Sequence, residues 1–143
     1  MNYIYHHQIS FDQCDPEGIL FFANTWDICH RVYESWLLSL NPEWGFWFQN
    51  QEWAIPIVNS EASFLKPIKP GTKIQIHLCL NKISDSSFTT VYEFIDESLS
   101  QRKTLTQCQI SHVFVDKKTF KKISLPSEIK TLFEPYLQNP LSS

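Results

Sequence analysis

The segment with the clearest chemical potential is residues 11–19, F-D-Q-C-D-P-E-G-I, which places the carboxylate of Asp15 just ahead of an expected helix. A helix N-terminus presents unpaired N–H groups and partial positive charge. Such an end can hydrogen-bond a carbonyl oxygen that is becoming an oxyanion, while a neighbouring carboxylate attacks the carbonyl carbon or activates water. Asp-Pro and glycine are also common turn residues, so Asp15 can equally cap nearby backbone in a simple turn. The residues alone leave both interpretations open.

Other reactive groups are less well placed. Cys14 is a possible nucleophile, but no neighbouring base would lower its pKa, and a buried, unreactive cysteine is the commoner case. The chain has only three glycines, and they form no dinucleotide-binding turn, phosphate-binding loop or nucleophile elbow. The histidines and the four cysteines lack the spacing of zinc ligands. We therefore expect free thiols, no cofactor and no metal.

The helix that follows the loop is expected at residues 22–40, a stretch without Gly or Pro. Its apolar residues recur every four positions, at Ile28, Val32, Trp36 and Leu40. This period places them on one buried stripe. Two polar pairs have the i,i+4 spacing of contacts on a helix surface, namely Asp27 with Arg31 and His30 with Glu34. Asn41 before Pro42 predicts the cap and first turn of a short second helix.

Strand-like segments make up most of the remaining chain, because apolar residues beyond residue 55 alternate with polar ones. We expect strands at residues 3–11, 57–65, 73–81, 88–94 and 104–115. Short turns between them, such as residues 84–86, favour antiparallel pairing. A small amphipathic helix is expected after Pro126. The order of one strand, a long helix and four strands predicts an α+β fold in which an antiparallel sheet of about five strands wraps around one long central helix.

Composition and charge limit the classes of function. A chain of 143 residues suits a single domain spanning residues 1–143, and no apolar stretch is long enough for a membrane span. The N-terminus lacks the pattern of a secretory signal, so we expect a cytoplasmic protein with no membrane partner. Residues 1–65 hold eight acids against one base, whereas residues 66–143 hold eleven bases against seven acids. This imbalance favours a small phosphate-bearing ligand over a nucleic acid, with contacts near residues 66–73 or 117–122.

Three motifs resemble those of the 4-hydroxybenzoyl-CoA thioesterase family of hotdog-fold proteins: F-D-Q-C-D-P-E-G-I-L-F-F-A-N at 11–24, K-P-I-K-P-G-T at 66–72 and Q-I-S-H-V-F-V-D at 109–116. The resemblance implies an acyl-CoA thioesterase in which Asp15 is the catalytic carboxylate, Gly18 shapes its loop and the backbone N–H of Phe22 polarises the thioester carbonyl. Lys66 and Lys69 then become candidate contacts for the phosphates of CoA. The family also implies a homodimer or homotetramer with active sites between subunits. Whether Asp15 acts as nucleophile or general base stays open, since both roles need the same carboxylate.

A narrower resemblance concerns the acyl group. The strings C-H-R-V-Y-E-S-W-L at 29–37 and A-I-P-I-V at 54–58 resemble the 1,4-dihydroxy-2-naphthoyl-CoA hydrolases of phylloquinone (vitamin K1) biosynthesis. Residues 21–53 contain ten aromatics, enough to line a slot for a flat bicyclic acyl group. Trp26, His30 and Glu34 are the candidate pocket residues. In the 4-hydroxybenzoyl enzymes, a helix acid thought to bind the ring hydroxyl aligns with His30, so a different polar group faces that place here.

Other functions of the same fold stay open. The substrate could instead be 4-hydroxybenzoyl-CoA or a short- or medium-chain acyl-CoA, and a non-catalytic acyl-CoA-binding hotdog protein is the alternative of another class. A hotdog hydratase is disfavoured. The signature of those enzymes resembles an Asp followed five residues later by a His, and here the later position is occupied by Leu20.

Overall fold

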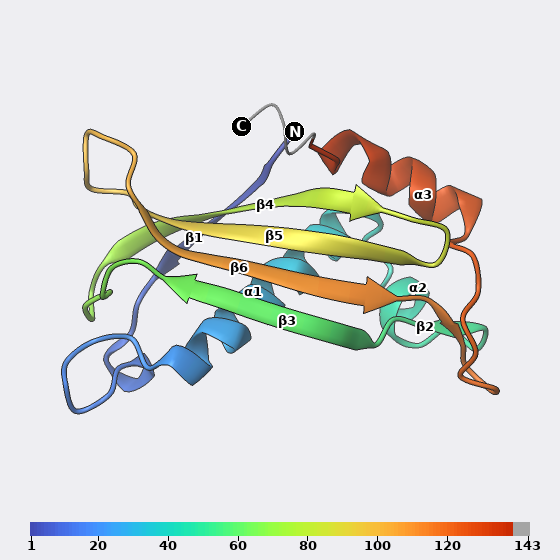
Figure 1. The fold of residues 1–143 in the computed structure, drawn as a ribbon, viewed down its shortest axis with the longest axis horizontal. Helices are drawn as coiled ribbons and strands as arrows, with labels where there is room; N and C mark the ends of the chain where they lie inside the picture. Colours follow the sequence, from blue (N-terminus) through green and yellow to red (C-terminus); the bar gives the residue numbers. More distant parts are fainter. Residues whose placement is uncertain (139–143) are drawn as a thin grey trace.

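The alternating segments of the sequence form one five-stranded antiparallel sheet in the order β1-β4-β5-β6-β3, in a computed structural model that describes residues 1–138 (Figure 1). The sheet strands are β1 (Tyr3–Gln8), β3 (Ile57–Phe64), β4 (Lys73–Ile83), β5 (Ser87–Asp96) and β6 (Thr104–Val113). A separate two-stranded sheet pairs β2 (Trp53–Ala54) with β7 (Val115–Asp116). The helices are α1 (Phe22–Leu40), α2 (Trp44–Phe48) and α3 (Ser127–Phe133), with short 3-10 turns η1 (Phe11–Gln13) and η2 (Glu134–Tyr136).

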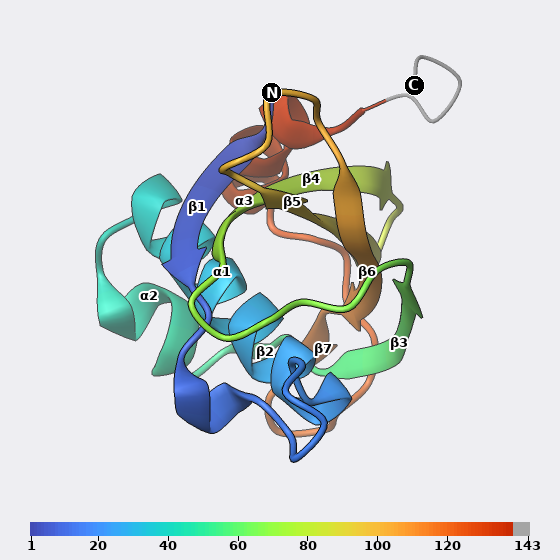
Figure 2. The same ribbon diagram turned by 90° about the vertical axis from the view of Figure 1, so that its left-hand side faces the viewer.

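The long helix α1 lies in the concave face of the sheet, which curves around it with β1 on one flank and β3 on the other (Figure 2). Ile28, Val32 and Trp36 of its apolar stripe are completely buried. The facing side chains of the two central strands are equally buried, at Ile74, Ile76, Leu78, Leu80, Phe88, Thr90, Tyr92 and Phe94. Burial of each large apolar side chain stabilises the fold by about 1.5–3 kcal/mol. The predicted α+β fold and the bounds of its central helix are confirmed.

The hairpin between β4 and β5 and the closing helix α3 also agree with the sequence. The N–H of Ser84 donates to the carbonyl of Ser87 across the expected turn at 2.8 Å. Helix α3 buries Ile129 and Phe133, and the Phe133 ring lies 4.8 Å from the ring of Trp36. The helix therefore seals the core beside the carboxyl half of α1.

Three local predictions are wrong. Strand β1 ends at Gln8 and not at residue 11, because the Gln13 side chain accepts a hydrogen bond from the Ser10 N–H at 3.0 Å and helps turn the chain into η1. Helix α2 begins at Trp44, because the Asn41 side chain accepts from the Glu43 N–H at 2.9 Å and forms a turn before the helix. The last strand ends at Val113, and the chain then starts β7.

Neither i,i+4 pair predicted on α1 is among the ion pairs of residues 1–138, which join His6 to Glu97 and Arg102 to Glu93.

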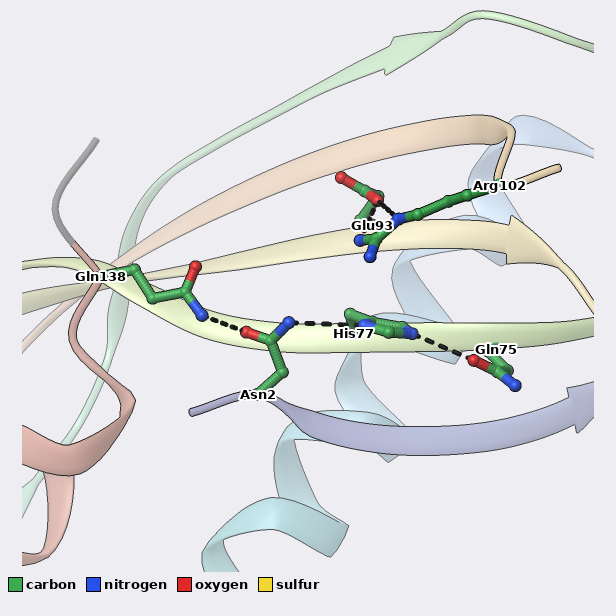
Figure 3. Close-up of polar contacts among 6 residues, drawn as sticks. All are labelled: Asn2, Gln75, His77, Glu93, Arg102 and Gln138. Carbon is green, nitrogen blue, oxygen red and sulfur yellow. Dashed lines mark hydrogen bonds and ion pairs between the residues drawn. The ribbon is translucent and has the colours of Figure 1, made fainter. Parts of the chain in front are cut away.

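Both ends of the described chain are joined to strand β4 by a line of polar side chains (Figure 3). Gln138 donates to the side-chain oxygen of Asn2, whose amide nitrogen donates to Nδ1 of His77 at 3.4 Å. Nε2 of His77 in turn donates to Gln75 at 3.1 Å. This direction of donation requires a neutral imidazole, in keeping with the pKa of His77, which burial and Arg102 lower. No helix in residues 1–138 is long and apolar enough to cross a membrane.

Candidate active site

Asp15 lies in a tight turn that fixes one of its carboxylate oxygens. Its Oδ1 accepts from the N–H of Glu17 at 2.9 Å and from the N–H of Ile19 at 3.5 Å. Gly18 closes the turn with a φ of 78°, a left-handed conformation that a residue without Cβ adopts at little cost. No hydrogen bond to Oδ2 is found among the described residues. The turn expected for Asp-Pro is therefore present, and it leaves one oxygen of a half-buried carboxylate for a ligand.

The first turn of α1 is held against the Asp15 loop and keeps its end donors available. The Phe21 N–H and the Asn24 side-chain amide both donate to the Gln13 carbonyl, at 3.0 and 2.8 Å. No side chain of the described residues 1–138 caps the N-terminus of the helix. Within residues 1–138, no hydrogen bond from the Phe22 N–H is found. The helix thus presents an unpaired donor next to the loop that carries the carboxylate.

One cavity of about 380 Å³ contains several of the expected site residues. It is lined by Asp15, Phe22, Lys66 and the previously unassigned Thr25, with apolar walls that include Leu20 and Ile68. Trp26 and Lys69 do not line it. Thr25 carried no sequence signal of its own, although its position three residues after Phe22 places both on one helix face.

A second basic residue accompanies Lys66. The Lys103 ammonium group lies beside that of Lys66 and lowers the pKa of Lys66. The two residues are adjacent because the N–H of Lys66 donates to the carbonyl of Leu105 at 3.0 Å, where β3 ends and β6 has just begun. Sequence reasoning missed Lys103, which only the pairing of these two strands brings close to Lys66.

Another cavity, of about 430 Å³, contains the expected polar residues of α1. His30 and Glu34 line it together with the aromatic side chains of Trp44, Trp47, Phe48 and Trp53. Lys117 closes one side, where its Nζ donates to the carbonyl of Asn50 at 2.6 Å. Trp26 lies outside this cavity and packs against the core. The size and the mixture of aromatic walls with few polar groups suit a small aromatic ligand.

The two cavities share no lining residue within one chain. Figure 1 shows α2 near the C-terminal end of α1, away from the loop that precedes α1. Residues of α2 line the aromatic cavity together with His30 and Glu34. The sequence placed Asp15, His30 and Glu34 in one site, and a single chain does not bring Asp15 together with the other two.

The remaining reactive groups offer no competing centre. All four cysteines are free, and the pKa of Cys14 is raised by burial and by the nearby charges of Asp15 and Asp12. A raised pKa keeps the thiol protonated and weakens it as a nucleophile. Residues 1–138 contain no cluster of three His, Cys, Asp or Glu side chains that could hold a metal ion.

Comparison with known proteins gives a consistent set of relatives. The profile of the family described as "Thioesterase-like superfamily" matches residues 9–133. A 1,4-dihydroxy-2-naphthoyl-CoA hydrolase from Nostoc punctiforme is 33% identical over 129 residues, covering 90% of this chain and 84% of its own. The corresponding hydrolase of Gloeothece citriformis is 30% identical, with 86% and 85% covered.

Solved structures agree on the fold. A 1,4-dihydroxy-2-naphthoyl-CoA thioesterase from Synechocystis superposes with a TM-score of 0.84 at 26% identity and covers 93% of this chain and 96% of its own. A 4-hydroxybenzoyl-CoA thioesterase superposes with a TM-score of 0.82 at 18% identity, covering 92% and 98%. At that identity the second likeness concerns the fold alone.

Proposed function

The chain belongs to the thioesterase-like superfamily, and on that premise we propose that it hydrolyses 1,4-dihydroxy-2-naphthoyl-CoA to the free acid and CoA, a step of phylloquinone biosynthesis. The observation that carries the chemistry is the cavity that Asp15 shares with Phe22 at the start of α1, where the Phe22 N–H has no partner in residues 1–138. The names of the relatives from Nostoc and Synechocystis support the choice of acyl group.

The chemistry follows from the charges in this cavity. The free oxygen of Asp15 attacks the thioester carbon or takes a proton from a water that does so. The carbonyl electrons move onto the oxygen, where the Phe22 N–H and the positive end of α1 stabilise the negative charge. Collapse of this tetrahedral intermediate re-forms the carbonyl and expels the CoA thiolate. If Asp15 was the nucleophile, the product is an acyl anhydride on Asp15, which water then hydrolyses to the free acid and the restored carboxylate. If Asp15 was the base, collapse gives the free acid directly, and the proton taken up by Asp15 passes to the CoA thiolate. Gly18 contributes by allowing the turn that fixes Oδ1 and directs the other oxygen.

The acyl group requires a second subunit in this proposal. Strand β3 is an edge strand that pairs with β6 alone among the described strands, and seven of its eight residues are exposed. Its apolar side chains include Val58, 60% exposed, and Phe64, 52% exposed. Exposed apolar edge strands pair readily with another chain. We place a second copy along this edge, as a homodimer or within a homotetramer, so that the aromatic cavity of one chain faces the Asp15 cavity of its partner.

In such a dimer His30 and Glu34 contact the ring hydroxyls of the acyl group. Trp26 lines neither cavity and packs against the hydrophobic core, so it is retained only as a residue that supports the pocket indirectly. The nucleotide end of CoA leaves toward Lys66 and Lys103, which lie close enough for Lys103 to lower the pKa of Lys66, and neither lysine belongs to an ion pair within residues 1–138. Exposed Lys69 lies three residues further along the same loop and is a more distant phosphate contact.

A substrate panel with the purified protein tests the proposal. Release of CoA should be fastest from 1,4-dihydroxy-2-naphthoyl-CoA, slower from unsubstituted naphthoyl-CoA and poor from palmitoyl-CoA, because a site built to hydrogen-bond hydroxyls rejects analogues that lack them. Faster turnover of 4-hydroxybenzoyl-CoA or of straight-chain acyl-CoAs would refute the assignment of the naphthoyl substrate. The assignment of the protein as a thioesterase would still hold. Binding of acyl-CoA without turnover of any thioester would identify a non-catalytic binding protein.

A further inference from the structure

Thr25 has a hydroxyl group for which the fold of residues 1–138 provides no partner. The residue is completely buried as the fourth residue of α1, and its Oγ1 makes no hydrogen bond to any described residue. It lines the same cavity as Asp15 and Phe22. A buried hydroxyl without a partner destabilises a protein, so its presence in the cavity that Asp15 also lines suggests a role that a ligand completes.

Local structure makes the unpaired state more unusual. Threonine in a helix commonly donates its hydroxyl to the carbonyl three or four residues earlier. Here the carbonyl of Phe21, four residues earlier, accepts from the Asn24 N–H at 2.9 Å, and Thr25 donates to neither carbonyl. The buried Thr90 of β5 differs, because its hydroxyl donates to the carbonyl of Ile110 at 3.2 Å.

The position on the helix indicates which atom of a ligand the hydroxyl meets. Phe22 and Thr25 are three residues apart and therefore share one face of α1. Side chains of a helix lean toward its N-terminus, the direction in which the Phe22 N–H also points. The hydroxyl of Thr25 and the N–H of Phe22 are therefore directed toward the same end of the cavity.

We propose that Thr25 is a second catalytic hydrogen-bond donor, which binds the thioester carbonyl oxygen of the substrate together with the Phe22 N–H. This inference rests on the proposed hydrolysis of a CoA thioester. When the Asp15 oxygen or its water adds to the carbonyl carbon, the displaced electron pair moves to the carbonyl oxygen and both donors shorten their bonds to it. Collapse returns the pair and expels the CoA thiolate, while Thr25 keeps its proton throughout.

The test compares two replacements of Thr25 with one at Thr90. Thr25→Val keeps the shape and removes the hydroxyl, Thr25→Ser keeps the hydroxyl, and Thr90→Val removes a hydroxyl that is already hydrogen-bonded in the core. We expect Thr25→Val to lower kcat by about 10- to 100-fold with KM within about threefold, because the donor acts on the developing oxyanion. Thr25→Ser should retain most of kcat. Thr90→Val should retain kcat and lower Tm.

Stability supplies the second measurement. Thr25→Val should leave Tm unchanged or raise it, because an unpaired buried hydroxyl is replaced by an apolar group of the same shape. A purely structural hydroxyl would give the reverse result, with a lower Tm and normal kcat. Wild-type kcat in Thr25→Val, or an equal loss in Thr25→Ser, overturns the role of Thr25 while the hydrolysis by wild-type protein stands. Absence of turnover in wild-type protein with every acyl-CoA of the panel overturns both proposals.

Discussion

The two oxygens of the Asp15 carboxylate have different surroundings. Oδ1 is held by the N–H groups of Glu17 and Ile19, which fix the orientation of the side chain. Such hydrogen bonds restrict the carboxylate before substrate arrives, so less conformational freedom is lost in the reactive geometry. The turn at Asp15 is therefore part of the proposed chemistry, and the structural and catalytic interpretations of this residue are compatible.

Replacing Asp15 by asparagine tests this division. The amide retains an oxygen for the turn, but it is neither a useful nucleophile nor a base, so kcat should fall by about 100-fold or more while ligand affinity is kept. The control is Asp12→Asn, an exposed acid of η1 that does not line the cavity. Steady-state release of CoA gives kcat for the three proteins. Near-normal turnover of Asp15→Asn would refute the assignment.

The buried His112 gives a prediction about pH. Its ring lies between those of Tyr33 and Phe88, with centroids 4.6 and 4.8 Å away, and only 2% of the residue is exposed. Burial, with a smaller contribution from His30, lowers the pKa of His112 to about 3. In the unfolded chain the group titrates near ~6.5, so below that pH the unfolded state binds a proton that the folded state refuses. The free energy of unfolding should therefore fall as pH decreases from 6.5 toward 3.

The matched variant is His112→Phe, which can stack between the same two rings without titrating. Below pH 6.5, the unfolding free energy of wild type should fall relative to that of the variant by about 1.4 kcal/mol for each pH unit. Above pH 6.5, the difference between the two proteins should stay constant. Urea unfolding at a series of pH values measures both curves. Other titrating groups such as His77 act on both proteins and cancel in the difference. Parallel curves of unfolding free energy against pH for the two proteins would mean that His112 binds its proton equally in the folded and the unfolded state.

At the scale of elements, the sequence predicted what simple periodicity controls. Helix α1 could be placed at residues 22–40 because one face must be apolar throughout, and the strands followed from alternation for the same reason. The starts of η1 and α2 were missed, because single side-chain hydrogen bonds of Gln13 and Asn41 decide them. Such bonds compete locally with regular structure and leave no periodic pattern in the sequence.

The membership of the site could be predicted only where the chain is continuous. Asp15, Gly18 and Phe22 lie within eight residues, so their proximity follows from local geometry. Lys103 joins Lys66 through the pairing of β3 with β6, across 36 intervening residues, which a single sequence does not reveal. The separation of the His30 cavity from Asp15 could have been inferred, because His30 lies eight residues after Phe22 on the continuous helix α1, about 12 Å further along its axis.

Lys66, just after the end of β3, and Lys103, just before the start of β6, give a prediction about binding of CoA. If Lys66 and Lys103 bind phosphates of CoA, the double change of both lysines to alanine should raise KM for acyl-CoA several-fold at low ionic strength with little change in kcat, and added salt should narrow the difference. The control is a double change of Lys82 and Lys130, which are exposed, line neither cavity and lie outside both basic segments, 66–73 and 117–122. Initial rates at two salt concentrations give KM. An unchanged KM for the Lys66 and Lys103 variant would exclude this phosphate site.

At the scale of the whole molecule, the proposed function requires the two cavities to meet. One chain places Asp15 in one cavity, and places the aromatic walls with His30 and Glu34 in another. The exposed apolar edge of β3 offers a surface on which a twofold-related copy can join them. Light scattering should accordingly find a dimer or tetramer, and a charge introduced by Val58→Glu should shift it toward monomer and reduce activity together.

Complementation between two inactive variants tests whether the site is shared. One variant carries Asp15→Asn, and the other carries His30→Ala with Glu34→Ala, which removes the polar groups of the aromatic cavity. If the cavities of different chains combine, random exchange of subunits creates sites that have both parts intact in about a quarter of all positions. Unfolding the two variants together and refolding them should therefore restore up to about a quarter of wild-type activity, whereas each variant refolded alone stays inactive. Mixed dimers that form, as seen by differently tagged chains, but recover no activity would show that each chain builds its site without its partner.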